Sequence, residues 1–368
     1  MNLKYLFITI IIILQLNCEK KTEDPIKIFR VRSLVDTIGY ANTAVKMDSL
    51  IRRIDRASAR ERQNILNIQN VNQERDWQLV ICPHDDYSYA GYIYPYVFQN
   101  ISTPIIFIFG VAHSARKNNI ANQLVFDSFT HWKGVYGNIP VSSLREKIIE
   151  ELQQDYFQIN DSLQQAEHSI EALLPFIQHY NRNIEIVPIL VSDMNFSLMK
   201  KISISLCNAM IKVTKQYNLI WGKDYSMVVS NDCVHYGDQN WNGKNLAPFG
   251  ADTAGYHAAT NFDMNIISEC LIDGLDPQRI QRFFEYTVMK DNFKEYAWTW
   301  CGRYSVPFGL LTAYYLQQKT KNTPLFGYML RYSTSIAQKQ IDVSDLNMGV
   351  TSPANIHHWV GYVAIGYN

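Results

Sequence analysis

The chain lacks an excess of either charge, with 34 basic and 34 acidic residues among its 368. A broad basic surface is therefore not expected, which makes nucleic-acid binding a poor prediction. Cysteine pairs are also missing. The five cysteines beyond Cys18 form no CxxC motif and no tight spacing, so they do not indicate a disulfide framework, and their odd number implies at least one free thiol.

Several catalytic motifs are absent too. The sequence has no HExxH motif, no glycine-rich phosphate loop and no GxSxG elbow. Ser114 directly follows His113, but this is not the strand-to-helix setting of a serine nucleophile. Hydrolysis by a serine nucleophile is therefore a minor hypothesis.

Long apolar runs are missing except at the start of the chain. Residues 5–16 form an apolar run after one lysine, and this run is too short to span a bilayer comfortably. It ends in LQLNC, which resembles the lipobox of bacterial lipoproteins, with Cys18 as the lipidated residue. We therefore expect residues 1–17 to be a lipoprotein signal peptide and the protein to be exported and anchored in the cell envelope by a lipid on Cys18. An uncleaved anchor and a simple secretory signal are the alternatives.

Three further segments follow from composition. Residues 18–39 begin with charged residues and a proline, which favours a solvated tether. Residues 40–75 carry spaced apolar residues among arginines, which predicts an N-terminal extension of one or two amphipathic helices. No linker rich in proline, glycine or serine divides residues 76–368, so we predict a single domain there.

This domain has the pattern of an α/β protein. Apolar runs without polar alternation predict strands buried on both faces, and the stretches between them predict crossover helices. A final pair of similar runs predicts two neighbouring strands. The fold class is therefore α/β, with a mainly parallel or mixed central sheet flanked by helices. The expected strands are residues 78–82, 104–111, 183–191, 226–230, 325–332 and 359–367, and the expected helices are residues 141–154, 169–180, 198–217 and 306–319.

Polar side chains follow three of these strands. His84 follows the first strand, His113 follows the second, and Asp232 and His235 follow the fourth. The carboxyl ends of parallel strands lie at one edge of a sheet, so we expect these side chains to converge. Each histidine alone would be read as a hydrogen-bonded, half-buried ring, but together they predict a metal site.

Two more residues are candidates. His168 begins an expected amphipathic helix, where it would hydrogen-bond to the site or cap the helix. Cys301 lies before the helix at 306–319 and close to Arg303, a setting that favours the thiolate. A small buried packing residue is the alternative for Cys301.

Five motifs occur in an order that matches a known family. They are Pro83-His84 with Tyr87, GVAHS at 110–114, EHSIEALLPFI at 167–177, SNDCVHYG at 230–237 and CGR at 301–303. With them the chain resembles the Memo family, also called the protein B component of the AmmeMemoRadiSam set. The resemblance implies a fold similar to that of class III extradiol dioxygenases.

The resemblance also implies a metal site. Its ligands would be His84, His113 and Cys301, with Asp232 and His235 beside them. Copper is implied by redox-active family members and iron by the dioxygenase kinship, while two histidines and a thiolate also suit zinc. The leading hypothesis is a metal-dependent redox enzyme acting on an unknown small molecule or peptide, with acid/base or supporting roles for Asp232, His235 and His168.

Two other functions stay open. The pocket could support metal-assisted hydrolysis. It could instead be a non-catalytic binding site for a peptide or protein, with an aromatic surface supplied by Tyr87, Tyr89, Tyr92, Tyr94 and Tyr96.

Asp85 and Asp86 depart from the family pattern, which usually has a small residue and a glycine after the first histidine. They add negative charge near the expected mouth, where they would face solvent or act as extra ligands or a base.

Overall fold

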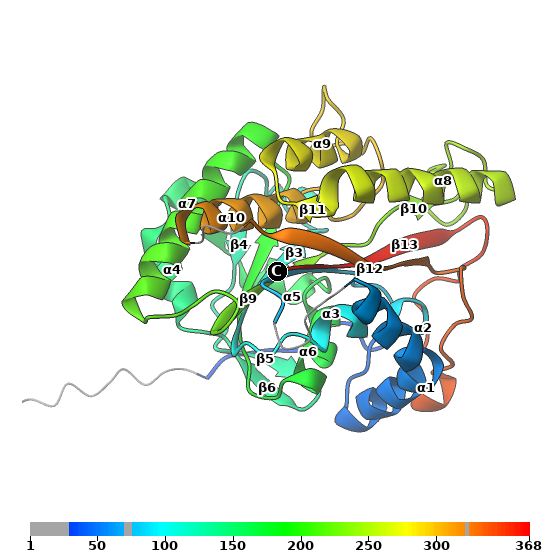
Figure 1. Cartoon of the computed structure of the whole chain (residues 1–368), viewed down its shortest axis with the longest axis horizontal. Coiled ribbons are helices and arrows are strands. Elements are labelled where there is room, and N and C mark those ends of the chain that lie inside the picture. The colour runs from blue at the N-terminus through cyan, green and yellow to red at the C-terminus, as the bar shows by residue number, and fades with distance from the viewer. Residues whose placement is uncertain (1–28, 70–75, 321–323) are drawn as a thin grey trace, which may run out of the picture.

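The structure is a computed structural model that describes residues 29–69, 76–320 and 324–368. Its centre is a ten-stranded sheet with the order β11-β12-β13-β2-β9-β3-β8-β4-β7, and β10 pairs with β13 (Figure 1). The strands are β2 (Leu79–Cys82), β3 (Ile105–Val111), β4 (Leu124–Phe126), β7 (Phe157–Ile159), β8 (Glu185–Val191), β9 (Tyr225–Ser230), β10 (His235–Tyr236), β11 (Asp273–Gly274), β12 (Phe326–Thr334) and β13 (Trp359–Tyr367).

The sheet is mixed. β2, β9, β3 and β8 are parallel neighbours, whereas β13 pairs antiparallel with both β2 and β12. In β2 the side chains of Leu79 and Ile81 join one hydrophobic cluster, and those of Val80 and Cys82 join the other. All four residues are fully buried, which is why the strand lacks polar alternation. The predicted fold class and the neighbouring pair β12 and β13 are confirmed.

Helices cover both faces of this sheet. One cluster packs α4 (Leu144–Glu151), α7 (Phe196–Gln216), α8 (Thr253–Ile266), α9 (Pro277–Thr287) and α10 (Ser305–Thr320). The other cluster packs α1 (Ala44–Ile68), α2 (Tyr87–Ala90), α3 (Pro95–Phe98), α5 (Asp161–Ala166) and α6 (Leu174–Tyr180). The short β-strand β1 (Val31–Arg32) joins β5 (His131–Gly134) and β6 (Gly137–Pro140) in a separate three-stranded sheet.

Two expected helices are shorter than predicted. The helix expected at 141–154 is α4, which begins at Leu144 and ends at Glu151. The helix expected at 169–180 begins with a 3-10 turn over Glu171–Leu173, and α6 starts only at Leu174. Pro175 lies in the first turn of α6, where its missing N–H leaves no helical hydrogen bond unmade.

The tether prediction is wrong for the part of it that the structure describes. Residues 31–40, which we call the N-terminal strap, lie on the domain. The Arg32 side chain is 1% exposed and forms a buried ion pair with Glu171. Arg32 also donates to the backbone carbonyl of Glu167 and stacks on Trp132, with 4.3 Å from the guanidinium carbon to the ring centroid. A solvated spacer would make none of these contacts.

The expected signal peptide, Cys18 and the first part of the expected tether, residues 18–28, lie outside the described residues. Within the described ranges, no helix is both long enough and apolar enough to cross a membrane.

Four of the five alternating tyrosines are buried, and Tyr92 is partly exposed. Tyr87, Tyr94 and Tyr96 are at most 1% exposed, and Tyr89 is 5% exposed. The Tyr94 ring stacks on Phe176, with 4.4 Å between the ring centroids. Most of the proposed aromatic surface is therefore part of the core, although Tyr89 lines the pocket.

Candidate metal centre and pocket

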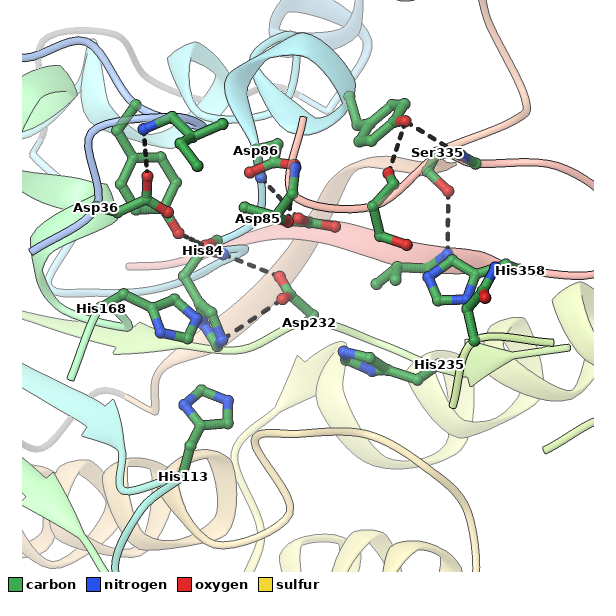
Figure 2. Close-up of a pocket in the computed structure, with 18 of the residues that line it drawn as sticks. Asp36, His84, Asp85, Asp86, His113, His168, Asp232, His235, Ser335 and His358 are labelled. Carbon is green, nitrogen blue, oxygen red and sulfur yellow. Dashed lines mark hydrogen bonds and ion pairs between the residues drawn. The ribbon is translucent and has the colours of Figure 1, made fainter. Parts of the chain in front are cut away.

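The carboxyl ends of three adjacent strands meet at the candidate site. His84 follows β2, Asp232 follows β9 and His113 follows β3, and these strands are neighbours in the sheet. Cys301 comes from the turn before α10. One ligand atom each from His84, His113 and Cys301 lie within 4.8 Å of one another. Figure 2 shows the rings of His84, His113 and His168 turned toward one another.

Hydrogen bonds fix the ring of His84. Its Nδ1 lies 2.7 Å from Ser230 Oγ, and Ser230 Oγ donates to the Ser169 carbonyl over 2.6 Å. The serine proton is thereby used, so His84 Nδ1 carries a hydrogen and Nε2 keeps its lone pair. His84 Nε2 lies 3.6 Å from Cys301 Sγ and 3.4 Å from the Asp232 carboxylate. The pKa of His84 lies well below its usual value, mainly because the ring is buried and secondly because His113 is close. The ring is therefore neutral.

His113 is held by a carboxylate. Its Nδ1 lies 3.0 Å from Glu167, which also accepts the backbone N–H of Ser114 over 2.7 Å. Burial acts to raise the pKa of Glu167, but the hydrogen bonds from His113 and Ser114 outweigh it and leave the pKa lowered. An ionised Glu167 orients the ring so that Nε2 of His113 is available as a ligand, as outer-shell carboxylates do for metal-binding histidines.

The environment of Cys301 shifts its pKa in the direction opposite to the one expected from the sequence. Its Sγ accepts the backbone N–H of Asp232 over 3.0 Å. Burial first, and then the negative charge of Asp232, raise the pKa of the Cys301 thiol well above its usual value, although Arg303 acts in the opposite direction. The protein alone therefore favours the thiol, and the predicted thiolate would need a bound cation.

Three predicted acid/base residues surround the cluster. Burial first, and then Asp85, raise the pKa of Asp232 well above its usual value. His235 Nδ1 donates to the carbonyls of Cys233 and Thr299, which leaves Nε2 as its basic nitrogen. The pKa of both His235 and His168 is lowered to about 4, mainly by burial and secondly by His113. Both rings are therefore neutral at pH 7. His168 stacks on His113 with 4.9 Å between ring centroids, and no side-chain cap is seen at the following turn.

Asp85 and Asp86 have structural partners. Asp85 accepts the Tyr362 hydroxyl over 2.6 Å, and Asp86 accepts both the backbone N–H and the hydroxyl of Thr351. Burial first, and then Asp85, raise the pKa of Asp86 to about 7. Both residues also line the pocket, so they connect its wall to the C-terminal segment.

A buried carboxylate supports the segment that leads to Cys301. Asp263 is fully buried and accepts the indole N–H groups of Trp298 and Trp300 over 2.8 and 2.6 Å, the Tyr332 hydroxyl over 2.8 Å and the backbone N–H of Val234 over 3.3 Å. This one side chain ties α8 and β12 to the segments that carry the site. No motif in the sequence marked Asp263, whereas Ser230 and Glu167 lay inside the recognised motifs without an assigned role.

The cluster opens into a cavity of about 780 Å³, a size that suits a small molecule. His84, His113, His168, Asp232 and His235 all line it, whereas Cys301 is not a lining residue and reaches the cluster through its contact with His84. Residues of the N-terminal strap and of a C-terminal loop, residues 348–358, complete its wall. The predicted site residues other than Cys301 therefore line one pocket, and Cys301 lies next to it.

Comparison with known proteins identifies the family. The model of the Memo-like protein family matches residues 46–347. A MEMO1 family protein of Pyrococcus furiosus is 26% identical over 166 residues, which are 43% of this chain and 52% of that protein. One of Aquifex aeolicus is 28% identical over 160 residues, 43% of this chain and 54% of that protein.

A MEMO1 family protein of Pyrococcus horikoshii is 24% identical over 264 residues, 69% of this chain and 80% of that protein. The chain spans about half the length of the first two relatives. Because the family model matches most of the chain, this protein belongs to the Memo-like family.

Proposed function

We propose that this protein binds a transition-metal ion at His84, His113 and Cys301 and is a metal-dependent redox enzyme for a small molecule or peptide. The observation that supports this best is the meeting of two imidazoles and one thiol within 4.8 Å, contributed by segments far apart in the sequence. Copper or iron is the proposed metal, and zinc is the alternative for this donor set.

The donor set fits a metal. Both histidines use Nδ1 for a hydrogen bond, to Ser230 and to Glu167, so each can present Nε2. When bound, copper or iron would supply electron transfer and Lewis acidity at the floor of the pocket. The high pKa of the free Cys301 thiol means that metal binding would release its proton.

The surrounding residues can manage protons. His235 has a neutral ring whose Nδ1 is fixed by two carbonyls, so its Nε2 can accept a proton from a bound substrate. Asp232 accepts the backbone N–H of His84 over 2.9 Å and contacts the His84 ring. Asp232 is therefore a positioning residue for His84, a proposed metal ligand. His168 packs against His113 and closes one side of the cluster.

The test is elemental analysis of the protein purified without chelator, beside His84→Ala and the exposed control His257→Ala. We expect near-stoichiometric copper or iron in the parent and the control, with at least tenfold less in His84→Ala, as an order of magnitude for losing one of three ligands. Full metal content in a His84→Ala, His113→Ala double variant would contradict the proposed site. Stoichiometric zinc would instead move the proposal to metal-assisted hydrolysis.

We also propose export as a lipoprotein, on the basis of the apolar run at residues 5–16 and the lipobox-like LQLNC. Labelled palmitate should be incorporated into the full chain expressed in a bacterium and should be absent from the Cys18→Ser variant. Equal labelling of both chains, or no labelling of either, would contradict lipidation at Cys18.

A further inference from the structure

Two segments close one side of the pocket. They are the N-terminal strap and the C-terminal loop, residues 31–40 and 348–358, and both lie outside the residues 46–347 that the family model matches. The backbone N–H of Gly349 donates to the Ile38 carbonyl over 2.9 Å, so the segments hold each other. We call these two segments the roof of the pocket. Because the roof lies outside the part that the family model matches, we look there for residues that set the substrate preference of this chain.

The strap places one carboxylate firmly in the pocket wall. Glu171 accepts the backbone N–H groups of Val35 and Asp36, at 2.9 and 3.0 Å. The Asp36 carboxylate in turn accepts the backbone N–H groups of Ile38 and Gly39, over 2.7 and 2.9 Å. Because both ends of this turn are bonded, Asp36 is held on the pocket wall (Figure 2).

The pocket wall holds acidic residues without a basic partner. Asp36, Asp85, Asp86 and Asp232 line the cavity, and none of its lining residues in the described ranges is a lysine or an arginine. Burial raises the pKa of Asp85, Asp86 and Asp232, which lowers the charge that these three carry at neutral pH, so the attraction of a cation depends on Asp36. An anionic group would meet repulsion there and find no basic side chain with which to pair, whereas a cation would be attracted by a field that the walls concentrate.

An indole ring is part of the same wall. Trp241 lines the pocket and stacks on His358, with 3.9 Å between ring centroids and 15° between planes, and its centroid lies 5.4 Å from that of His235. An indole face attracts organic cations as well as apolar groups. The pocket lining thus combines acidic residues with an indole ring.

We propose that the roofed pocket selects small organic cations, such as amines, over anions of the same size, and that Asp36 is a specificity-determining residue. This inference names a substrate class for the site and rests on the proposed function, because a bound cation is a substrate only if the protein is the proposed enzyme. The selection itself resides in the strap and the pocket wall, so it can be measured with or without metal.

The experiment compares benzylammonium, benzyl alcohol and benzoate, which share one aromatic frame and differ in charge. Binding to the full chain is measured by calorimetry, both as purified and after chelator treatment, with the metal content of each sample determined separately. In the chelator-treated protein we expect benzylammonium to bind about tenfold or more tighter than benzoate, with benzyl alcohol between them. High salt should reduce this preference.

Asp36→Asn removes the charge but keeps an oxygen that can accept the two backbone N–H groups of the turn. It should weaken benzylammonium binding about threefold or more and leave benzyl alcohol unchanged. The control is Asp273→Asn at the sheet edge, where the side chain is 76% exposed, and it should keep the parent preference.

Equal or tighter binding of benzoate in the chelator-treated protein, or no binding of benzylammonium, would overturn the inference. So would a preference that Asp36→Asn leaves intact. A protein that lacks metal but prefers benzylammonium would contradict the redox function and support the selection, so the two failures are distinguishable.

Discussion

At the scale of single residues, His235 links the electrostatics of the pocket to the pH dependence of stability. Its folded pKa is about 4 against an ordinary value of 6.5, with burial as the largest cause. Below pH 6.5 the unfolded chain takes up the proton first, so the stability contributed by His235 is full above pH 6.5 and is lost progressively as the pH falls toward 4.

We predict that the unfolding free energy of the His235→Asn variant decreases less than that of the parent as the pH falls. Asparagine can donate to the carbonyls of Cys233 and Thr299 as Nδ1–H does, but it does not titrate. Between pH 7 and pH 5 the chelator-treated parent should lose about 2 kcal/mol more unfolding free energy than the variant, as measured by urea denaturation.

His257→Gln, which removes an exposed histidine of α8, is the matched control and should keep the parent slope. An identical pH dependence for His235→Asn and the parent would show that His235 does not titrate differently in the folded and unfolded states.

The sequence identified some site residues for a physical reason. His84, His113 and Asp232 follow neighbouring parallel strands, and the direction of the strands brings them to one edge. Only the family resemblance predicted that Cys301 lies beside them. Cys301 is far from these strands in the sequence, and sequence separation does not tell which residues are close in the folded protein. Local sequence also does not reveal the burial of Cys301, which is the largest cause of its raised pKa and favours the thiol in the absence of a cation.

At the scale of elements, the buried strands were predictable because each one carries its own signal in a run of apolar residues. The strap was not predicted. The charged stretch with a proline that favoured a tether is residues 19–27, which precede the strap. The strap itself lies on the domain because Arg32 pairs with Glu171, a residue 139 positions away. Partners so distant leave no periodic pattern in the sequence.

Close packing between the strap and the loop after β2 leads to a second prediction. A Cβ atom on Gly39 would lie 1.9 Å from Oδ1 of Asp86, while the carboxylate of Asp86 is held by Thr351. Gly39→Ala should therefore displace the strap and lower the unfolding free energy by about 1–3 kcal/mol, measured by urea denaturation.

Gly274→Ala in β11 is the control, because the nearest atom to its added Cβ would be 3.9 Å away. If Gly39→Ala were no more destabilising than Gly274→Ala, the strap would have room to move away from Asp86 at little cost.

At the scale of the whole molecule, the pocket is assembled from both ends of the described chain. The central strands supply His84, His113 and Asp232, whereas the strap and the C-terminal loop supply the roof. Glu171 connects the two parts, because it accepts backbone N–H groups of the strap and lies four residues after Glu167, the partner of His113. Arg32 of the strap also donates directly to the carbonyl of Glu167, so the strap contacts the residue that holds His113.

The Arg32–Glu171 pair should accordingly contribute strongly to stability. Arg32→Met keeps the apolar stem and removes the guanidinium, which leaves the buried Glu171 without its counter-charge. We predict a loss of about 3–5 kcal/mol of unfolding free energy, together with faster proteolysis within residues 31–40. Arg30→Met is the control, because Arg30 is 45% exposed in its ion pair with Asp161 and should cost less than about 1 kcal/mol. Equal losses in the two variants would mean that the strap is held mainly by its backbone hydrogen bonds, those of Val35 and Asp36 to Glu171 and that of Gly349 to Ile38.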